Sequence, residues 1–488
     1  MSTPSTPPTP SSSLERKEED ALDTLDTRQT PIEEKSLSDS RKGGEQDVVE
    51  LPDGGLRAWL VVFGAMCNHF CSLGYISAWG TFQAYYQGTI LRTSTPADIA
   101  WVGSIQVGLS LMPGLVVGRL LDMGYCRPSL AVSSALIIIG TFLVPECKSY
   151  WQFLLCQGFT IGLGTGGVIA INLSIVGHWF KRRRGLAVSV VATGASIGGV
   201  SFPIIIRALL LRVGFPWCMR IVGFLLMLLL GVGNVLLRTR LPPSTVGFQR
   251  KAFRQLFSSP AYVVYCASGF TAFMGAWTAL TFLNAFALSI GISPGFAIYL
   301  TSIANGVSII SRPLCGHASD RWGPLNVMIP STLILGISTY AWPYAKDQAS
   351  LIAIAVIYGF VSWPPILRFI PTDTFSDPSF ALGAYFALIT NPVYPMGPSG
   401  DLGLRIGVAL TVFGFGALIG TPISGTIQRS TGSYAPVGLY AGEYTAFGRP
   451  LVYDFDSSTL GSTNVVAAIQ MILARQLLLG WTVLKGKV

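Results

Sequence analysis

The chain has 488 residues, of which half are hydrophobic and only 12% are charged, and its formal net charge is +9. Soluble domains carry about 25% charged residues, so this composition excludes an ordinary soluble protein and indicates a membrane protein. The 54 glycines and 30 prolines agree with this interpretation, because both residues are commoner in membrane helices than in soluble ones.

The first fifty residues differ from the rest of the chain. Residues 1–50 hold 6 basic and 12 acidic side chains, which leaves 27 basic and 12 acidic side chains for the remainder. The segment is rich in Ser, Thr, Pro and acidic residues, and it cannot bury enough apolar surface to offset its chain entropy. We therefore expect a disordered cytosolic tail. A cleavable signal peptide is not expected, because the N-terminus lacks a basic stretch followed by an apolar one.

Apolar runs follow the turn residues at 52–55, and each is close to the roughly 20 residues that cross a bilayer core. We predict an all-α membrane protein with twelve transmembrane helices in two six-helix halves, 51–237 and 260–488, joined by a cytosolic linker at 238–259. Residues 429–461 are expected to form a long outer loop. The predicted spans are 57–86, 99–121, 129–145, 151–177, 185–206, 217–237, 260–289, 297–317, 325–345, an interrupted tenth span, 403–427 and 463–484.

Lysine and arginine favour one set of alternate loops over the other by fifteen to seven. The positive-inside rule therefore places both termini and the 238–259 linker in the cytosol. An even number of spans requires the same arrangement, so span count and charge agree. Because the basic excess is confined to short loops between apolar runs, it indicates membrane topology and no nucleic-acid partner.

The tenth span is interrupted. An apolar run from Leu351 to Val361 is followed by a polar stretch, and the apolar pattern resumes from Gly383 to Met396. Neither piece alone crosses a core of roughly 30 Å at about 1.5 Å per residue, whereas the two joined make one ordinary helix. We interpret residues 362–382 as an insertion in helix 10, such as an unspliced intron. A broken helix that lines a transport cavity is the alternative.

Two related octets mark equivalent places in the two halves. In each, an aspartate follows a glycine by four residues, as in Gly118 to Asp122 and Gly316 to Asp320, and the two glycines are 198 residues apart. Such carboxylates can pair with the facing half and with helix N-terminal amides, so we expect an inner gate here. The predicted gating residues are Asp122, Arg127, Asp320, Arg321 and Arg183. For the arginine run at 182–184, topology alone is an alternative explanation.

The octets resemble the loop motif of the major facilitator superfamily, and further motifs resemble its monocarboxylate porter-like family, in the fungal branch. Four segments carry this likeness: Pro52-Asp53-Gly54-Gly55 with Trp59, Gly74 and Gly80-Thr81-Phe82; His178 to Ala187 with Gly194 to Gly199 and Pro203; Asn305, Ser308, Arg312 and Gly316 to Gly323 with Asn326; and Leu404 to Gly407 with Gly416 to Pro422. The resemblance implies the major facilitator fold and secondary transport across the plasma membrane.

The sequence departs from animal members of that family at two places. Those members have a lysine in the outer part of helix 1, where this chain has Ile76 and Ser77, and an aspartate one turn before the helix 8 arginine, where this chain has Ser308. The resemblance therefore does not imply their proton-linked lactate transport. The fungal branch shares this departure and moves varied organic solutes, including products of secondary metabolism.

Ionisable groups at mid-membrane are costly, and those present are usually functional. Arg312 in helix 8 could bind an anionic substrate through a forked pair of hydrogen bonds, or it could bind backbone carbonyls as a structural residue. His69 could relay a proton, or it could be a neutral imidazole satisfied by a neighbouring helix. With Asn68, Asn305 and Trp277, these residues form the predicted substrate site, although core packing would also explain Asn305 and Trp277.

Small residues complete the prediction. Gly194, Gly198 and Gly199 lie on nearby faces of helix 5, where they would let helices approach closely and let the halves rock.

We find no metal-ligand spacing, nucleophile motif or phosphate-cradling loop, and the eight cysteines form no C-x-x-C pair, so no enzyme activity, metal or cofactor is expected. The sequence thus predicts a secondary transporter of an organic solute, a monocarboxylate-like anion or a secondary metabolite, with the proton as a candidate coupling ion. The alternative is a transport-inactive sensor or a decayed transporter disrupted at helix 10.

Overall fold

The computed structural model describes residues 53–240, 250–360, 382–397, 401–442 and 463–479. Within these ranges every regular element is a helix, as the apolar periodicity requires in a chain whose backbone groups must be satisfied inside a bilayer. The expected disordered tail (1–50), part of the linker and nearly all of the expected insertion (362–382) lie outside the described residues.

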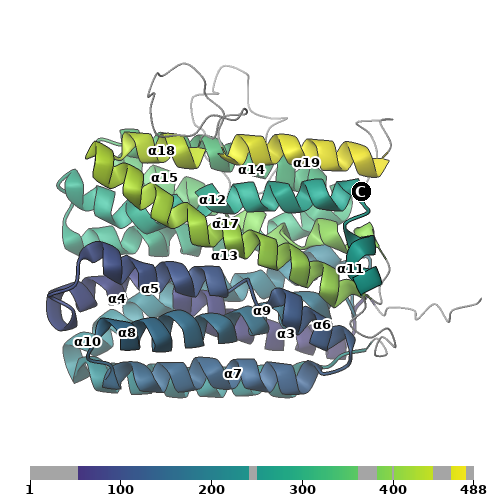
Figure 1. Cartoon of the computed structure of the whole chain (residues 1–488), viewed down its shortest axis with the longest axis horizontal. Coiled ribbons are helices and arrows are strands. Elements are labelled where there is room, and N and C mark those ends of the chain that lie inside the picture. Colours follow the sequence, from purple (N-terminus) through teal and green to yellow (C-terminus); the bar gives the residue numbers. More distant parts are fainter. Residues whose placement is uncertain (1–52, 241–249, 361–381, 398–400, 443–462, 480–488) are drawn as a thin grey trace, which may run out of the picture. The chain divides into compact units, whose positions relative to one another are not determined.

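The early part of the chain forms helices up to Leu236 (Figure 1). A capping box formed by Thr95 and Asp98 begins α5, because each side chain accepts a hydrogen bond from the other residue's backbone amide. The α-helices are α3 (Leu56–His69), α4 (Trp79–Tyr85), α5 (Pro96–Leu109), α6 (Gly114–Asp122), α7 (Cys126–Leu143), α8 (Tyr150–Phe153), α9 (Gly162–Val176) and α10 (Arg184–Leu236). Short π- or 3₁₀-helical turns extend them at η1 (Phe70–Gly74), η2 (Tyr86–Ile90), η3 (Val144–Glu146) and η4 (Leu154–Ile161).

The later part of the chain continues the helical pattern. Its helices are α11 (Arg250–Leu256), α12 (Pro260–Ser289), α13 (Pro294–Trp322), α14 (Pro324–Ala341) with η5 (Trp342–Tyr344), α15 (Gln348–Phe360), α16 (Leu382–Leu388) with η8 (Asn391–Met396), α17 (Leu402–Thr431), α18 (Ala435–Gly442) and α19 (Thr463–Leu479). The expectation of a plain loop from 429 to 461 is wrong for its first part. Helix α17 runs to Thr431, where Gly432 ends it with a left-handed backbone, and α18 follows.

Among the described residues, eight helical segments are long and apolar enough to cross a membrane: Leu56–Ile90, Asp98–Asp122, Cys126–Glu146, Tyr150–Val176, Arg184–Leu236, Pro260–Leu283, Pro324–Tyr344 and Leu402–Thr431. The 53-residue α10 contains Gly214 in a non-helical conformation (φ 73°), so two helices meet at this kink. At about 1.5 Å per residue, its length far exceeds a core of roughly 30 Å, which agrees with two separate passes. A total of twelve spans stays a prediction.

Two spans that the sequence predicts as continuous are interrupted. The segment after α5 breaks at residues 110–113, because Pro113 lacks an N–H and its ring excludes an undistorted helix before it. The segment after η1 breaks at residues 77–78, where the Ser77 hydroxyl donates to the Leu73 carbonyl at 2.9 Å. Both breaks place polar side chains beside the central cavity described below.

Helices from distant parts of the sequence pack together in Leu51–Val488. The early helices lie in one layer of Figure 1 and the later ones in another. Contacts join α10 to α13, and α17 to α5 and α6, so elements of the early layer meet elements of the late one. This seam contains the candidate site.

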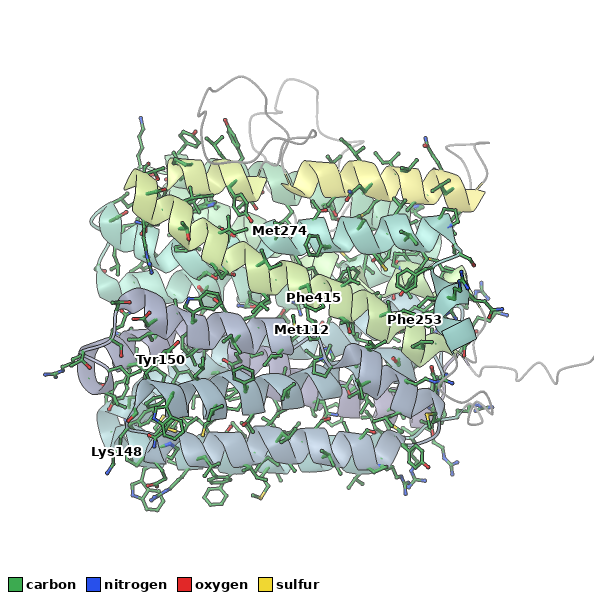
Figure 2. The ribbon with its side chains drawn as sticks, viewed as in Figure 1. Met112, Lys148, Tyr150, Phe253, Met274 and Phe415 are labelled. Carbon is green, nitrogen blue, oxygen red and sulfur yellow. The ribbon has the colours of Figure 1, made fainter. Side chains whose placement is uncertain are left out.

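Large apolar side chains cover the outside of the bundle. Phe415 on α17 is 49% exposed, and Leu211 on α10 is 83% exposed. Lys148 and Tyr150 lie at one end of the bundle and Phe253 at the other, with Phe415 between them (Figure 2). Because exposed apolar surface of this extent is unfavourable in water, the arrangement fits helices whose outer faces contact lipid.

Candidate functional site at the seam between early and late helices

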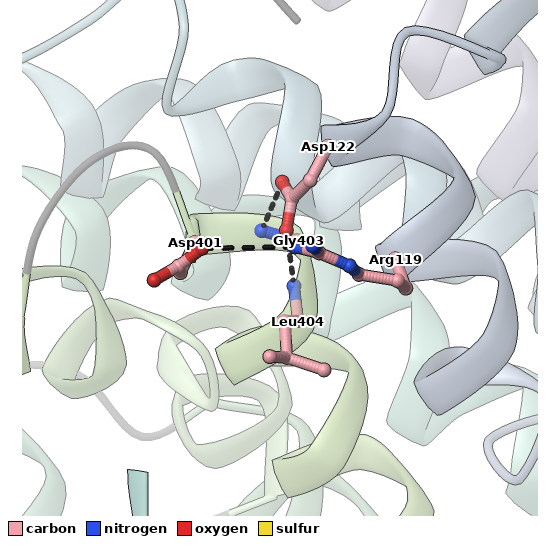
Figure 3. A network of polar contacts seen from close by, with 5 residues as sticks. All are labelled: Arg119, Asp122, Asp401, Gly403 and Leu404. Carbon is pink, nitrogen blue, oxygen red and sulfur yellow. Dashed lines mark hydrogen bonds and ion pairs between the residues drawn. The ribbon is translucent and has the colours of Figure 1, made fainter. Parts of the chain in front are cut away.

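The first aspartate of the paired octets joins the two layers at one end of the seam. The Asp122 carboxylate, at the end of α6, accepts hydrogen bonds from the backbone N–H groups of Gly403 and Leu404, each at 2.8 Å (Figure 3). These amides belong to the first turn of α17, where the helix dipole also favours a negative charge. We call this cluster the Asp122 latch.

The second octet forms the same arrangement with the roles of the two layers exchanged, because its aspartate lies on a late helix and binds the start of an early one. The Asp320 carboxylate, near the end of α13, accepts hydrogen bonds from the N–H groups of Gly185 at 2.7 Å and Leu186 at 2.9 Å. These amides belong to the first turn of α10. We call this cluster the Asp320 latch. The two octets therefore place two carboxylates in equivalent positions, each bound to a helix start in the other layer.

Glycines make both latches possible. A Cβ added to Gly118 would lie 2.1 Å from the Gly403 carbonyl oxygen, and one added to Gly316 would lie 2.4 Å from the Gly185 carbonyl oxygen. Both distances are far below van der Waals contact, so any larger residue would push the facing helix away. The glycine of each octet is thus explained by close backbone approach.

The arginines predicted for the gate are placed differently from one another. Arg183 and Arg321 are exposed and line a cleft beside the Asp320 latch. Arg127 is also exposed, and in the described part of the chain no hydrogen bond or ion pair joins its side chain to the latches. The structure therefore brings Asp122 and Asp320 into hydrogen bonds across the seam but does not bring Arg127 there.

Sequence reasoning missed two further contacts at this end. Arg119 and Asp401 form an ion pair, with 3.6 Å between Nη1 and Oδ1, beside the Asp122 latch (Figure 3). The Asp53 carboxylate accepts hydrogen bonds from the backbone N–H groups of Lys181 and Arg182. A hint for the second was present, because Asp53 precedes two glycines at a helix start, but nothing in the sequence names the loop that it binds.

A central cavity of about 150 Å³ lies between the layers. Arg312 is its one arginine, and no aspartate or glutamate lies among the described residues that line it. The other polar or aromatic lining residues are His69, Ser77, Trp79, Thr81, Gln83, Ser110, Phe273, Trp277, Thr281, Thr301, Asn305 and Phe386. Of the five predicted substrate-site residues, Arg312, His69, Asn305 and Trp277 line this cavity.

Arg312 is buried, at 7% exposure, and crosses the seam. Its guanidinium donates a hydrogen bond to the carbonyl of Ala192 on α10, as the structural alternative expects. Its Nε–H, however, has no partner among the described residues, and the Trp277 indole N–H also has none. Two buried donors at the cavity are therefore unsatisfied by the described residues, which is energetically costly.

His69 is held by its neighbours. The Asn172 side-chain amide nitrogen lies 3.0 Å from His69 Nδ1 and donates to it in the tautomer that carries the ring proton on Nε2. Asn68 is fully buried, donates to the Asn172 Oδ1 atom at 3.2 Å, and is not among the described residues that line the cavity, so its place in the substrate site stays a prediction. It packs against Gly233, where a small residue leaves room for the amide.

The packing glycines of α10 separate into two roles. A Cβ on Gly194 would meet the Met66 carbonyl oxygen at 2.1 Å, and one on Gly198 would meet the Gly74 Cα atom at 2.7 Å, so the first allows contact with α3 and the second with η1. A Cβ on Gly199 would meet the Asn305 side chain at 2.7 Å, so this glycine allows contact across the seam. No group of three metal-ligating side chains occurs within the described ranges.

Comparison with known proteins identifies the family. The family model of the Major Facilitator Superfamily matches residues 59–391. An MFS-type transporter of Ophiocordyceps sp. is 32% identical over 423 residues, covering 86% of this chain and 90% of the relative. An aspyridones efflux protein of Emericella nidulans is 32% identical over 403 residues, covering 82% of this chain and 78% of the relative. A fujikurins efflux protein of Gibberella fujikuroi is 30% identical over 422 residues, covering 86% of each.

Solved structures share the fold. The human organic anion transporter MFSD10 superposes with a TM-score of 0.59 at 13% identity, covering 87% of this chain and all of the other. The transporter FucP superposes with a TM-score of 0.56 at 16% identity, covering 86% of this chain and 99% of the other. These likenesses carry the fold, and the sequence matches carry the family. The chain belongs to the Major Facilitator Superfamily and is a multi-pass membrane transporter.

Proposed function

We propose that the protein exports an organic anion of the secondary-metabolite class by alternating access. The observation that carries this proposal is the charge of the central cavity. Arg312 supplies a cation, no carboxylate lies among the described lining residues, and Trp277, Phe273 and Phe386 supply aromatic surface. A guanidinium with a free donor suits a carboxylate or enolate, and aromatic walls suit a rigid, largely apolar body.

The cavity and the latches together support alternating access. A volume of about 150 Å³ is smaller than the roughly 300–1,000 Å³ of small-molecule sites, so a metabolite needs the helices to separate before it can bind. The Asp122 and Asp320 latches both join helices across the seam. Releasing them would let the early and late helices rock apart at that end.

The finer assignments follow the same proposal. We assign twelve spans in two halves of six, with the latches, both termini and the linker in the cytosol, because basic residues favour those loops. We place the protein in the plasma membrane and in the fungal branch of monocarboxylate porter-like proteins. The direction is outward, in keeping with relatives that are named as efflux proteins for aspyridones and fujikurins.

His69 is our candidate for proton coupling. It is the one histidine among the residues that line the cavity. A proton taken at Nδ1 would break the hydrogen bond from Asn172 and so would change a contact between α3 and α9. We expect His69→Gln to flatten the pH dependence of transport while the protein still reaches the membrane. An unchanged pH profile would remove His69 from this role.

Metabolite export from cells tests the main proposal. We expect a strain that lacks the protein to retain an acidic, aromatic metabolite that the parent strain releases into the medium. The wild-type protein restores release. Arg312→Ala does not, whereas Arg254→Ala, which changes an exposed arginine on α11 outside the cavity, does. Restored release by Arg312→Ala at equal surface protein would refute the role of Arg312.

The competing hypothesis is a transport-inactive sensor or a decayed transporter. The relatives named as efflux proteins do not favour it. Its expected cause, an insertion at 362–382, is tested by expressing versions with and without those residues. If both versions reach the plasma membrane and neither restores release, the transporter proposal fails.

A further inference from the structure

A second cavity opens beside the Asp320 latch and has a volume of about 1,100 Å³. We call it the basic cleft. It lies between the start of α10 on one side and the end of α13, the start of α14 and η8 on the other. Its lining residues are Lys181, Arg182, Arg183, Arg184, Gly185, Leu186, His317, Ser319, Asp320, Arg321, Trp322, Gly323, Pro324, Asn391 and Pro395.

The charge of the basic cleft is strongly unbalanced. Five of its lining side chains are Lys or Arg, and its one carboxylate, Asp320, is already bound by two backbone amides. The Arg184 guanidinium lies 4.4 Å from the centre of the Tyr394 ring. The remaining four, at positions 181–183 and 321, are exposed. Cations therefore face this space from both layers of the fold.

An independent observation indicates a ligand. Asn391 lines the basic cleft and is 5% exposed, yet neither its amide nitrogen nor its amide oxygen has a hydrogen-bond partner among the described residues. A buried amide without partners costs free energy, so such a group in a native structure needs an explanation. Membrane topology explains a basic loop, but it does not explain this asparagine.

We propose that the basic cleft binds an anion carrying several phosphate groups, of the inositol polyphosphate class. Arginine presents a planar fork of donors that matches phosphate oxygens, and Asn391 would complete the site with one donor and one acceptor. Basic pockets between membrane helices on the cytoplasmic side are suited to phosphorylated lipid headgroups. The ligand can be the headgroup of a phosphoinositide or the same headgroup free in solution.

Such a ligand would act on the gate. It would bridge Arg183, which directly precedes α10, and Arg321, in the last turn of α13, beside the hydrogen bonds of the Asp320 latch. Binding at both sides of the seam stabilises the conformation in which the sides are close. The site is therefore a regulatory one, separate from the central cavity.

Binding to the purified full-length protein tests this inference without any transport assay, so its result is independent of the proposed export function. The probes are free inositol 1,4,5-trisphosphate and a short-chain phosphatidylinositol 4,5-bisphosphate, with phosphatidylcholine as the uncharged comparison. Affinity is measured by thermophoresis in detergent at fixed salt, because charge interactions depend on ionic strength. Binding of either phosphorylated probe supports the inference and identifies the source, and binding of neither overturns it.

Three variants locate the site. Removing one basic residue near an anionic headgroup is expected to weaken binding about fivefold, so Arg183→Gln combined with Arg321→Gln should weaken it roughly 25-fold. Arg254→Gln removes an exposed arginine of α11 outside the cleft and should leave affinity unchanged. Equal affinity of the double variant and wild type, or an equal loss in Arg254→Gln, overturns the assignment.

Asn391→Ala separates a binding role from a structural one. If the amide serves the ligand, its removal should weaken binding at least several-fold while the melting temperature without ligand stays the same or rises, since two unsatisfied buried atoms are removed. Unchanged affinity, or a large fall in the ligand-free melting temperature, would contradict the proposed role of Asn391.

Discussion

Replacing Asp122 with asparagine is expected to weaken the closed seam without unfolding the helices. The carboxylate accepts two backbone hydrogen bonds at 2.8 Å from Gly403 and Leu404 and is only 7% exposed. An asparagine keeps one acceptor oxygen but turns an NH₂ group toward the other amide. Hydrogen bonds to charged groups contribute about 1.5–3 kcal/mol each. The substitution breaks one such bond and leaves the other with a neutral acceptor, so the closed seam loses about 2–4 kcal/mol. That corresponds to a shift of roughly 30- to 700-fold toward the open seam.

Hydrogen exchange measures this shift directly. In Asp122→Asn, the backbone amides of the peptide containing residues 403–404 should exchange roughly 30- to 700-fold faster than in the wild type, while peptides from the middle of α17 keep their protection. The matched control is Asp98→Asn, because Asp98 accepts a hydrogen bond from the Thr95 amide at 3.2 Å but lies outside the latches. Unchanged exchange at 403–404, or an equal effect of the control, would refute the gate role of Asp122.

Two further changes test the same seam. Gly118→Ala would place a Cβ 2.1 Å from the Gly403 carbonyl oxygen and should abolish release of the metabolite while the amount of protein at the cell surface stays normal. The control is Gly231→Ala, whose Cβ meets nothing within 4 Å and should have no effect. An active Gly118→Ala variant would contradict the packing argument. Changing only Arg119 to aspartate, or only Asp401 to arginine, should lower the transport rate. Combining the two changes should raise the rate about fivefold above that of the single variants, since a partly exposed pair contributes up to ~1 kcal/mol. A combined variant no better than the worse single variant would count against that pair.

The sequence alone determined the class of this protein. The low share of charged residues and the long apolar runs require a helical bundle in lipid, because only helices satisfy their own backbone groups there over such lengths. The repeated spacing from glycine to aspartate singled out Asp122 and Asp320, since a charge retained beside apolar segments needs a defined partner. Arg312 was recognisable for the same reason.

The partners were decided only by the tertiary structure. Nothing local to Asp122 specifies Gly403, which lies 281 residues away, and nothing local to Asn68 shows that it donates to Asn172. A sequence pattern reports the face of a helix but not the helix that packs against it. The fold therefore decided which polar side chains satisfy each other, and which ones, such as Arg312 and Asn391, have donors without a partner among the described residues.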